Sequence, residues 1–269
     1  MTIYHPVDLC QPDGSKSCGA CCGLYNWTDH SRRAIQTLLN VQTDLFHAQK
    51  DFSHLDKLRS IRDSAIHNKK LFETIYNCEF LGFVDAARKK VGCMLHPSVT
   101  GRPELRDHCF YGTKICNEHF CPSYSCLTTS EQRAVIHSVN DWYLYGLIIT
   151  DIDLVKNYFE HVENSIGESI KINKFHNNAL HAILSEFFKL KENWPFKSSD
   201  NRLGKYYFSK TEYNIARIEY EKRWGILPSR FNRILVSLES DFKTKRDLEE
   251  AERIIQQNMD CFIQAYNAC

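Results

Sequence analysis

Apolar residues in the second half of the chain recur at the spacing of helices. Val135, Val139 and Trp142 fall three or four residues apart, which places them on one face of a helix. Just before them, Thr129 and Gln132 resemble a capping box, so we expect a helix to begin close to Ser130. The same spacing returns at Gly146, Ile149, Ile166, Ile170, Leu180, Leu184, Phe187, Phe231, Ile234, Leu238, Ile254, Ile255, Met259 and Phe262. These stripes predict a helical bundle, interrupted by a loop over residues 193–202 and a tight break over 225–228.

The first half of the chain joins a helical stretch to a segment without regular patterning. Residues from about 30 to 76 contain no cysteine and carry apolar residues at helical spacing, which predicts an insertion of two helices. Residues 78–126 carry scattered glycine and proline, which disfavours long helices and strands. We therefore expect a mainly α protein in which an irregular cysteine-rich metal-binding region, 1–127, is wrapped on a helical bundle, 128–269.

Charge and hydropathy narrow the function classes. The chain has 34 Lys and Arg against 33 Asp and Glu, so no global field would attract nucleic acid or an anionic membrane. The N-terminus has no apolar signal segment, and the longest apolar stretch, Tyr143–Ile149, is too short to span a bilayer. We expect a cytoplasmic protein that binds neither nucleic acid nor membrane. The many aromatic residues are expected to lie in the core.

Cysteine is the residue type that points to chemistry. Ten of the twelve cysteines lie between Cys10 and Cys126. In a reducing compartment, cysteines serve as metal ligands, reactive thiols or small buried residues more often than as disulfides. This number exceeds the need for small buried residues, so metal binding is favoured. Cys18 and Cys21 form a CxxC pair that can chelate one ion, with Gly19 giving the backbone freedom for the turn.

One CxxC pair is weak evidence by itself, because a closed thiolate site needs four ligands. The other ligands would come from the dispersed cysteines, which are Cys78, Cys93, Cys109, Cys116, Cys121 and Cys126. Cys22 is adjacent to Cys21, and neighbouring residues seldom both reach one tetrahedral ion. Cys22 would then serve a second metal, a second iron of a cluster, or local packing.

Several ordered blocks of sequence together resemble a known family. The blocks are Cys18-Gly19-Ala20-Cys21-Cys22-Gly23, Cys78-x-Phe80-Leu81, Val91-Gly92-Cys93-Met94-Leu95-His96-Pro97, Gly101-Arg102-Pro103-x-Leu105-Arg106-Asp107-x-Cys109-Phe110-Tyr111-Gly112 and Cys116-x4-Cys121-Pro122-Ser123-Tyr124. This pattern resembles the YkgJ-like cysteine-cluster family, described as a zinc- or iron-chelating domain, to which flagellin lysine N-methylase looks related. The resemblance covers about residues 10–126. The insertion after Cys22 is longer than in compact members, and the C-terminal helices have no counterpart.

The resemblance implies a set of metal ligands. The shared ligand candidates are Cys18, Cys21, Cys22, Cys78, Cys93 and Cys109, and a longer subgroup adds Cys116 and Cys121. Thiolate-rich sites suit an iron-sulfur cluster or iron, and alternatively zinc. For His96, His108 and His119 we favour a place behind the ligands or at the surface over direct ligation. Arg102, Arg106 and Asp107 are candidates for a functional role, but we favour a structural one, in which the arginines neutralise the negative charge of the thiolates.

These observations predict a metal-binding protein that holds a cysteine-ligated iron-sulfur or zinc centre. It would act as a redox or methyl-transfer enzyme, for which a protein is a plausible substrate. The alternative is a non-catalytic, zinc-stabilised module that binds a protein partner, and a third hypothesis is a metal carrier or sensor. No nucleotide-binding loop, metalloprotease motif or nucleophile elbow is present in the sequence.

Overall fold

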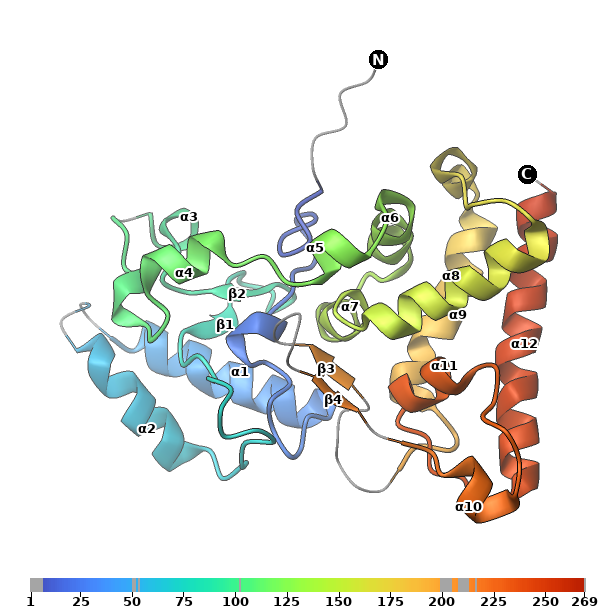
Figure 1. The fold of residues 1–269 in the computed structure, drawn as a ribbon. Coiled ribbons are helices and arrows are strands. Elements are labelled where there is room, and N and C mark those ends of the chain that lie inside the picture. The colour runs from blue at the N-terminus through green and yellow to red at the C-terminus, as the bar shows by residue number, and fades with distance from the viewer. Residues whose placement is uncertain are drawn as a thin grey trace. The chain divides into compact units, whose positions relative to one another are not determined.

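The computed structural model describes residues 7–49, 52, 54–101, 103–198, 205–207, 213–215 and 217–268. This part of the chain is mainly helical and also contains two short antiparallel sheets of two strands each (Figure 1). It divides into two compact units. Unit 1 comprises the described parts of 1–9, 121–140 and 147–269, and unit 2 comprises those of 10–120 and 141–146. The mainly α class is confirmed, and the predicted boundary after residue 127 stays a prediction.

Unit 2 contains the cysteine-rich segments and the helical insertion. Its elements are the 3-10 turn η1 (Ala20–Cys22), α1 (Arg32–His47), η2 (Leu55–Lys57), α2 (Leu58–Ala65), β1 (Leu81–Phe83), β2 (Val91–Cys93), α3 (Pro97–Thr100), η3 (Arg106–His108) and α4 (Gly112–Glu118). The two helices predicted between residues 30 and 76 are confirmed as α1 and α2. As predicted for residues 78–126, the strands and helices there are short.

Helix α1 forms the core of unit 2 by packing on β1. Ser31 starts the helix because its hydroxyl accepts a hydrogen bond from the backbone N–H of Ala34 at 3.3 Å. The buried face carries Ile35, Leu38, Leu39 and Phe46. From this face the Thr43 hydroxyl accepts the N–H of Phe83 at 2.8 Å, which ties β1 directly to the helix. Helix and sheet therefore set the position of residues 78–93.

Unit 1 has helices where the apolar stripes over 180–187, 231–238 and 254–262 predicted them, whereas the stripe of Ile166 and Ile170 crosses the end of a helix. Its elements are α5 (Ser123–Cys126), α6 (Thr129–Ser138), α8 (Ile152–Ile166), η4 (Ile172–His176), α9 (Asn178–Asn193), β3 (Lys205–Tyr207), β4 (Tyr213–Ile215), α10 (Tyr220–Trp224), α11 (Asn232–Ser237) and α12 (Lys245–Asn267), while α7 (Trp142–Ile149) contributes residues to both units. The long helix α12 packs on α8 and α9 (Figure 1). Tyr158 and Phe187 meet in this core with ring centroids 4.3 Å apart.

The start and end of α6 differ in detail from the prediction. The helix begins at Thr129, close to the predicted Ser130, but its capping box is Thr128 with Glu131. The predicted box of Thr129 with Gln132 is wrong by one residue, because Thr128 is the residue with extended backbone. The apolar stripe also does not belong to one helix, since α6 ends at Ser138 and α7 begins at Trp142.

The predicted breaks in the second half correspond to helix ends. Helix α10 ends at Trp224, and Gly225 has the left-handed φ of 63° that closes such an end. The predicted tight break is confirmed. Helix α9 ends at Asn193, as the predicted loop requires, and residues 199–202 of that loop lie outside the described residues.

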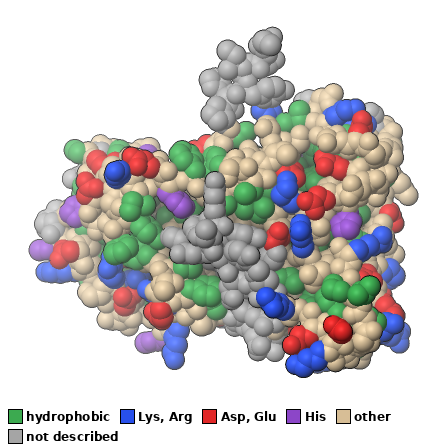
Figure 2. All heavy atoms as spheres, in the orientation of Figure 1, with side chains coloured by type: hydrophobic (Ala, Val, Ile, Leu, Met, Phe, Trp, Pro, Cys, Tyr) green, Lys and Arg blue, Asp and Glu red, His purple; other side chains and the backbone are tan. Residues whose placement is uncertain are grey.

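The surface shows mixed charge. On the face seen in Figure 2, Lys and Arg side chains are interspersed with Asp and Glu, and apolar side chains lie between them. Among the helices that the structure describes, none combines the length and apolar character needed to cross a bilayer.

Candidate thiol site

Two buried asparagines join the segments that carry Cys22 and Cys78. The side-chain amide of Asn26 donates to the Asn77 Oδ1 atom at 2.7 Å, and the Asn77 amide donates to the carbonyl of Gly23 at 3.1 Å. Both asparagines are at most 2 % exposed. Buried amides that satisfy each other in this way fix one relative placement of the two segments.

The backbones of Cys22 and Cys78 lie side by side and are joined by a hydrogen bond. The N–H of Cys78 donates to the carbonyl of Cys22 at 2.9 Å, and Gln42 of α1 donates to the carbonyl of Cys78 at 2.9 Å. The turn after Cys22 depends on Gly23, whose φ is +79°. Gly19, which was predicted to allow the turn between Cys18 and Cys21, has a φ of −115°. A Cβ atom on Gly23 would lie 2.3 Å from the carbonyl oxygen of Tyr76, so glycine is required there for close approach as well.

Cys109 and Cys116 form a close pair of thiols. Cys109 directly follows η3, Cys116 lies on α4, and their Sγ atoms are 3.8 Å apart. Cys109 is only 8 % exposed, whereas Cys116 is exposed. The pair therefore has one thiol inside the unit and one at the surface.

Hydrogen bonds shift the pKa values of Cys109 and Cys116 in opposite directions. The pKa of Cys109 is lowered. The largest cause is a hydrogen bond from Cys116, and the second largest is one from Cys78. Backbone N–H groups of Gly112 and Tyr111 also donate to the Cys109 sulfur and act in the same direction. The pKa of Cys116 is raised because its proton is held by Cys109. The first proton lost from the pair thus leaves a thiolate on Cys109.

The neighbouring thiols favour their neutral forms. Burial, with smaller contributions from the neighbouring Cys93, Cys10 and Cys109, raises the pKa of Cys22 to about 12. Burial also raises the pKa of Cys93, which terminates β2. Thiols of Cys22, Cys78, Cys93, Cys109 and Cys116 therefore lie near enough to influence one another.

An arginine and a glutamate border the thiols. The Arg106 guanidinium makes two hydrogen bonds to the Glu104 carboxylate, at 2.8 and 2.5 Å. The positive charge of Arg106 lowers the pKa of Cys93, although burial of that thiol is the larger effect. The charge of Arg106 is paired with Glu104, so its predicted role in balancing the thiolates stays a prediction. Arg102 lies outside the described residues.

Three aromatic rings lie beside the thiols and were expected only to be core. Ring centroids of Tyr76 lie 5.1 Å from Phe110 and 5.1 Å from Tyr111. Burial raises the pKa of Tyr111, and the nearby Cys22 thiolate adds to this. Phe110 is 68 % exposed, which a core residue would not be. The sequence carries one signal for this placement, because Phe110 and Tyr111 directly follow Cys109.

The predicted metal function is wrong. Across the described ranges, no three or more His, Cys, Asp and Glu side chains are placed so that they could hold a metal ion. The two sulfurs of Cys109 and Cys116 would supply only half of a closed thiolate site. Neither a cysteine-ligated iron-sulfur or zinc centre nor a zinc-stabilised module is therefore supported. The choice among iron-sulfur cluster, iron and zinc stays an untested prediction.

The remaining predicted site residues occupy varied positions. Cys18 and Cys21 are partly exposed in unit 2, and Cys121 is buried in unit 1. His96 starts α3, where its Nδ1 atom accepts the N–H of Ser98 at 3.2 Å. His108 is exposed and His119 is partly buried.

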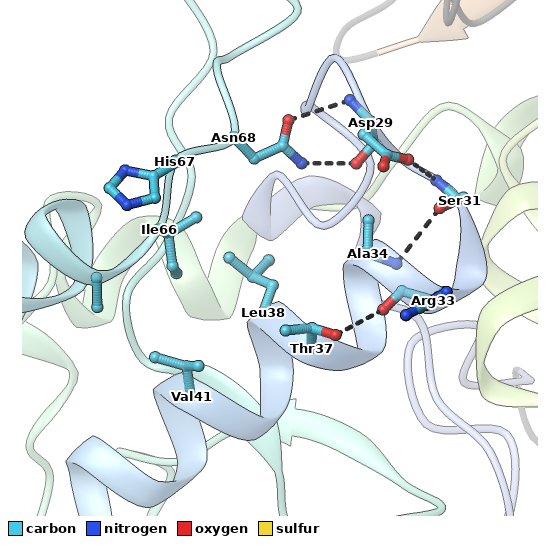
Figure 3. Close-up of a pocket in the computed structure, with 11 residues that line it drawn as sticks. Asp29, Ser31, Arg33, Ala34, Thr37, Leu38, Val41, Ile66, His67 and Asn68 are labelled. Atoms are coloured by element: carbon cyan, nitrogen blue, oxygen red, sulfur yellow. Dashed lines mark hydrogen bonds between the residues drawn. The ribbon is translucent and has the colours of Figure 1, made fainter.

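A separate pocket in unit 2 was not predicted. It has a volume of about 460 Å³ and lies between α1 and the segment 65–68. Figure 3 shows Ile66 on one side and Leu38 and Val41 of α1 on the other, with Asn68 hydrogen-bonded to Asp29 at the end. Those polar groups hold the two segments together, and no cysteine lines the pocket.

Comparisons with family models, with curated proteins and with solved structures found no match for this chain. The resemblance to the YkgJ-like family therefore stays a prediction.

Proposed function

We propose that the chain is a thiol–disulfide oxidoreductase whose working pair is Cys109 and Cys116. The observation that carries the proposal is the 3.8 Å separation of their Sγ atoms. Because the sulfurs of a disulfide are about 2 Å apart, a closing movement of roughly 2 Å would join them. Six residues separate the two cysteines in the sequence, and the second lies on a short helix near the surface.

Exposure assigns different roles to the two sulfurs. Cys116 is exposed, so a substrate thiolate can reach its sulfur from solvent when the pair is oxidised. Cys109 is buried and receives hydrogen bonds, which makes it the better leaving group. Attack at Cys116 is therefore the productive direction.

The reaction is a two-step exchange. A substrate thiolate attacks Sγ of Cys116, a bond forms between these sulfurs, and the bond to Cys109 breaks with Cys109 leaving as thiolate. A second substrate thiolate then attacks the substrate sulfur of the mixed disulfide and releases Cys116, which takes up a proton. The substrate dithiol is oxidised to a disulfide while the protein disulfide is reduced to thiol and thiolate. A low-molecular-weight disulfide restores the oxidised pair by the reverse exchange.

Exposed apolar side chains favour a protein as the substrate. Phe110 follows Cys109 in the sequence and is 68 % exposed, and Ile115 precedes Cys116 and is 50 % exposed. Apolar side chains exposed beside a reactive site are typical of surfaces that bind other proteins. A segment with two cysteines among apolar residues would match both features.

The proposal is tested by equilibrating the protein in glutathione redox buffers that contain a metal chelator. Free thiols are then alkylated, and disulfides are located by peptide mapping. We expect a Cys109–Cys116 disulfide, and we expect the oxidised protein to convert a reduced two-cysteine peptide to its disulfide. Cys116→Ser should lose this transfer. Cys126→Ser, which changes another exposed thiol, should keep it.

Two results would contradict the proposal. One is a folded protein, as judged by circular dichroism, in which no Cys109–Cys116 disulfide forms at any ratio of reduced to oxidised glutathione. The other is stoichiometric iron or zinc in protein purified without oxygen or chelator, with loss of that metal in Cys109→Ser.

A further inference from the structure

A third thiol approaches the same sulfur from a different segment. Cys78 and Cys109 lie near enough that each thiol shifts the pKa of the other. Ring contacts support this placement independently, because Tyr76 packs on both Phe110 and Tyr111. The segment of Cys78 therefore lies against the segment of Cys109. Both thiols are 8 % exposed.

We propose that Cys78 is an internal resolving thiol that takes the disulfide over from Cys116 and keeps it as a buried Cys78–Cys109 disulfide. The inference rests on the proposed function of Cys109 and Cys116. Cys109 is then the central sulfur, with an exposed partner in Cys116 and a buried partner in Cys78.

The transfer is one thiol–disulfide exchange and needs no added reactant. The Cys78 sulfur attacks Sγ of Cys109, the Cys78–Cys109 bond forms, and the Cys109–Cys116 bond breaks. The proton of Cys78 passes to the Cys116 sulfur, directly or through solvent. One thiol and one disulfide become a different disulfide and one thiol, so the oxidation state of the protein as a whole is unchanged.

Burial gives the second disulfide a distinct property. A reductant in solution reaches the exposed Cys116, whereas Cys78 and Cys109 are each only 8 % exposed. The inner disulfide should therefore be reduced more slowly than the outer one. The protein would retain an oxidised form while Cys116 is again a free thiol at the surface.

The inference is tested with a time course on the reduced full-length protein. One equivalent of dithiodipyridine is added, samples are quenched in acid at increasing times, and free thiols are alkylated with N-ethylmaleimide. Trypsin separates the three cysteines, because Arg88 and Arg106 lie between Cys78 and Cys109, and Lys114 lies between Cys109 and Cys116. A further digestion at Glu118 separates Cys116 from Cys121.

We expect the Cys109–Cys116 peptides to appear first and then to decline as Cys78–Cys109 peptides accumulate. Alkylation of Cys116 should recover with the same rate. In Cys78→Ser the outer disulfide should persist and Cys116 should not recover. Cys261→Ser, which removes an exposed thiol of unit 1, should behave as the unchanged protein.

The buried position of Cys78 calls for a second variant that leaves it intact. In Cys116→Ser the reagent can react only with the inner thiols of the trio, and we expect Cys78–Cys109 to form directly. A persistent outer disulfide with Cys78 alkylated throughout, or a Cys22–Cys78 disulfide instead, would overturn the inference. If the Cys109–Cys116 disulfide never forms although Cys78–Cys109 forms in Cys116→Ser, the proposed function fails and the inner pair stands alone.

Discussion

The ammonium group of Lys191 lies 2.6 Å from Oδ2 of Asp151 inside unit 1, where the two side chains are only 4 % and 3 % exposed. Ser237 links the same groups, since its carbonyl accepts from Lys191 at 2.7 Å and its hydroxyl donates to Asp151 at 2.9 Å. Asp151 directly precedes α8, Lys191 lies in α9, and Ser237 is the last residue of α11. This polar cluster therefore ties three helices of the bundle together.

Replacement of Asp151 by Asn should destabilise the protein strongly. The Lys191 charge would stay buried without a counter-charge, although Asn can still accept the N–H of Leu154 at the start of α8. We expect the free energy of unfolding, measured by urea titration with circular dichroism, to fall by about 3–5 kcal/mol. Glu186→Gln removes the exposed pair with Lys189 and should change it by less than about 1 kcal/mol. Similar effects of both changes would contradict this assignment.

Thr128 and Thr129 should respond differently to alanine. Thr128→Ala removes the acceptor for the N–H of Glu131 at the start of α6 and should cost about 1 kcal/mol of stability. Thr129→Ala is the matched control, because Thr129 is exposed at the first helical position and alanine favours helix. Thr128→Ala should have the lower thermal unfolding midpoint of the two variants, and the opposite ranking would reject the observed cap.

The same pair of threonines shows how far sequence patterns reach. Thr128 with Glu131 and Thr129 with Gln132 both fit the capping pattern, and only the extended backbone of Thr128 (φ −67°, ψ 159°) decides between them. The apolar stripes of α9 and α12 were readable because burial on one face sets their spacing. A helix is thus predictable to within a residue or two, while its exact cap depends on a local choice.

From the sequence, only the grouping of the cysteines could be predicted, and not which sulfur atoms meet. The number and order of cysteines indicated that Cys22, Cys78 and Cys109 come together. Which sulfurs meet depends on buried amides such as Asn26 and Asn77, whose role has no sequence signal. The metal prediction failed for the same reason, since counting sulfurs does not establish that several surround one point in space.

The ion pair of Glu104 with Arg106 should make stability depend on pH in the acid range. Hydrogen bonds from Arg106 lower the pKa of Glu104 to about 2, below its value in an unfolded chain of about 4.3. The stabilisation is therefore complete above the unfolded pKa and is lost as the pH falls toward 2. Glu104→Gln should melt below the unchanged protein at pH 7, and this difference should shrink between pH 4.5 and 2.

Arg106→Gln serves as the companion variant for this effect. It removes the donor of the hydrogen bonds to Glu104, so replacing Glu104 in that background should no longer alter how the melting temperature depends on pH. A difference between Glu104→Gln and the unchanged protein that stayed constant from pH 7 to pH 2 would show that the ion pair is not formed.

Gly23 and Gly101 allow backbone strain to be separated from steric clash beside the thiols. Both have left-handed φ, +79° and +62°, but a Cβ on Gly23 would meet backbone atoms of Tyr76 and Asn77, at 2.3 and 2.8 Å, whereas on Gly101 it would meet nothing within 4 Å. Gly101→Ala should therefore cost only the strain, about 1 kcal/mol, and Gly23→Ala at least about 3 kcal/mol in urea titration. Because the displaced backbone leads directly to Cys78, Gly23→Ala should also speed the alkylation of that thiol by N-ethylmaleimide. Equal costs for the two variants, with Cys78 still protected, would mean that the turn after Cys22 does not hold the two thiol segments together.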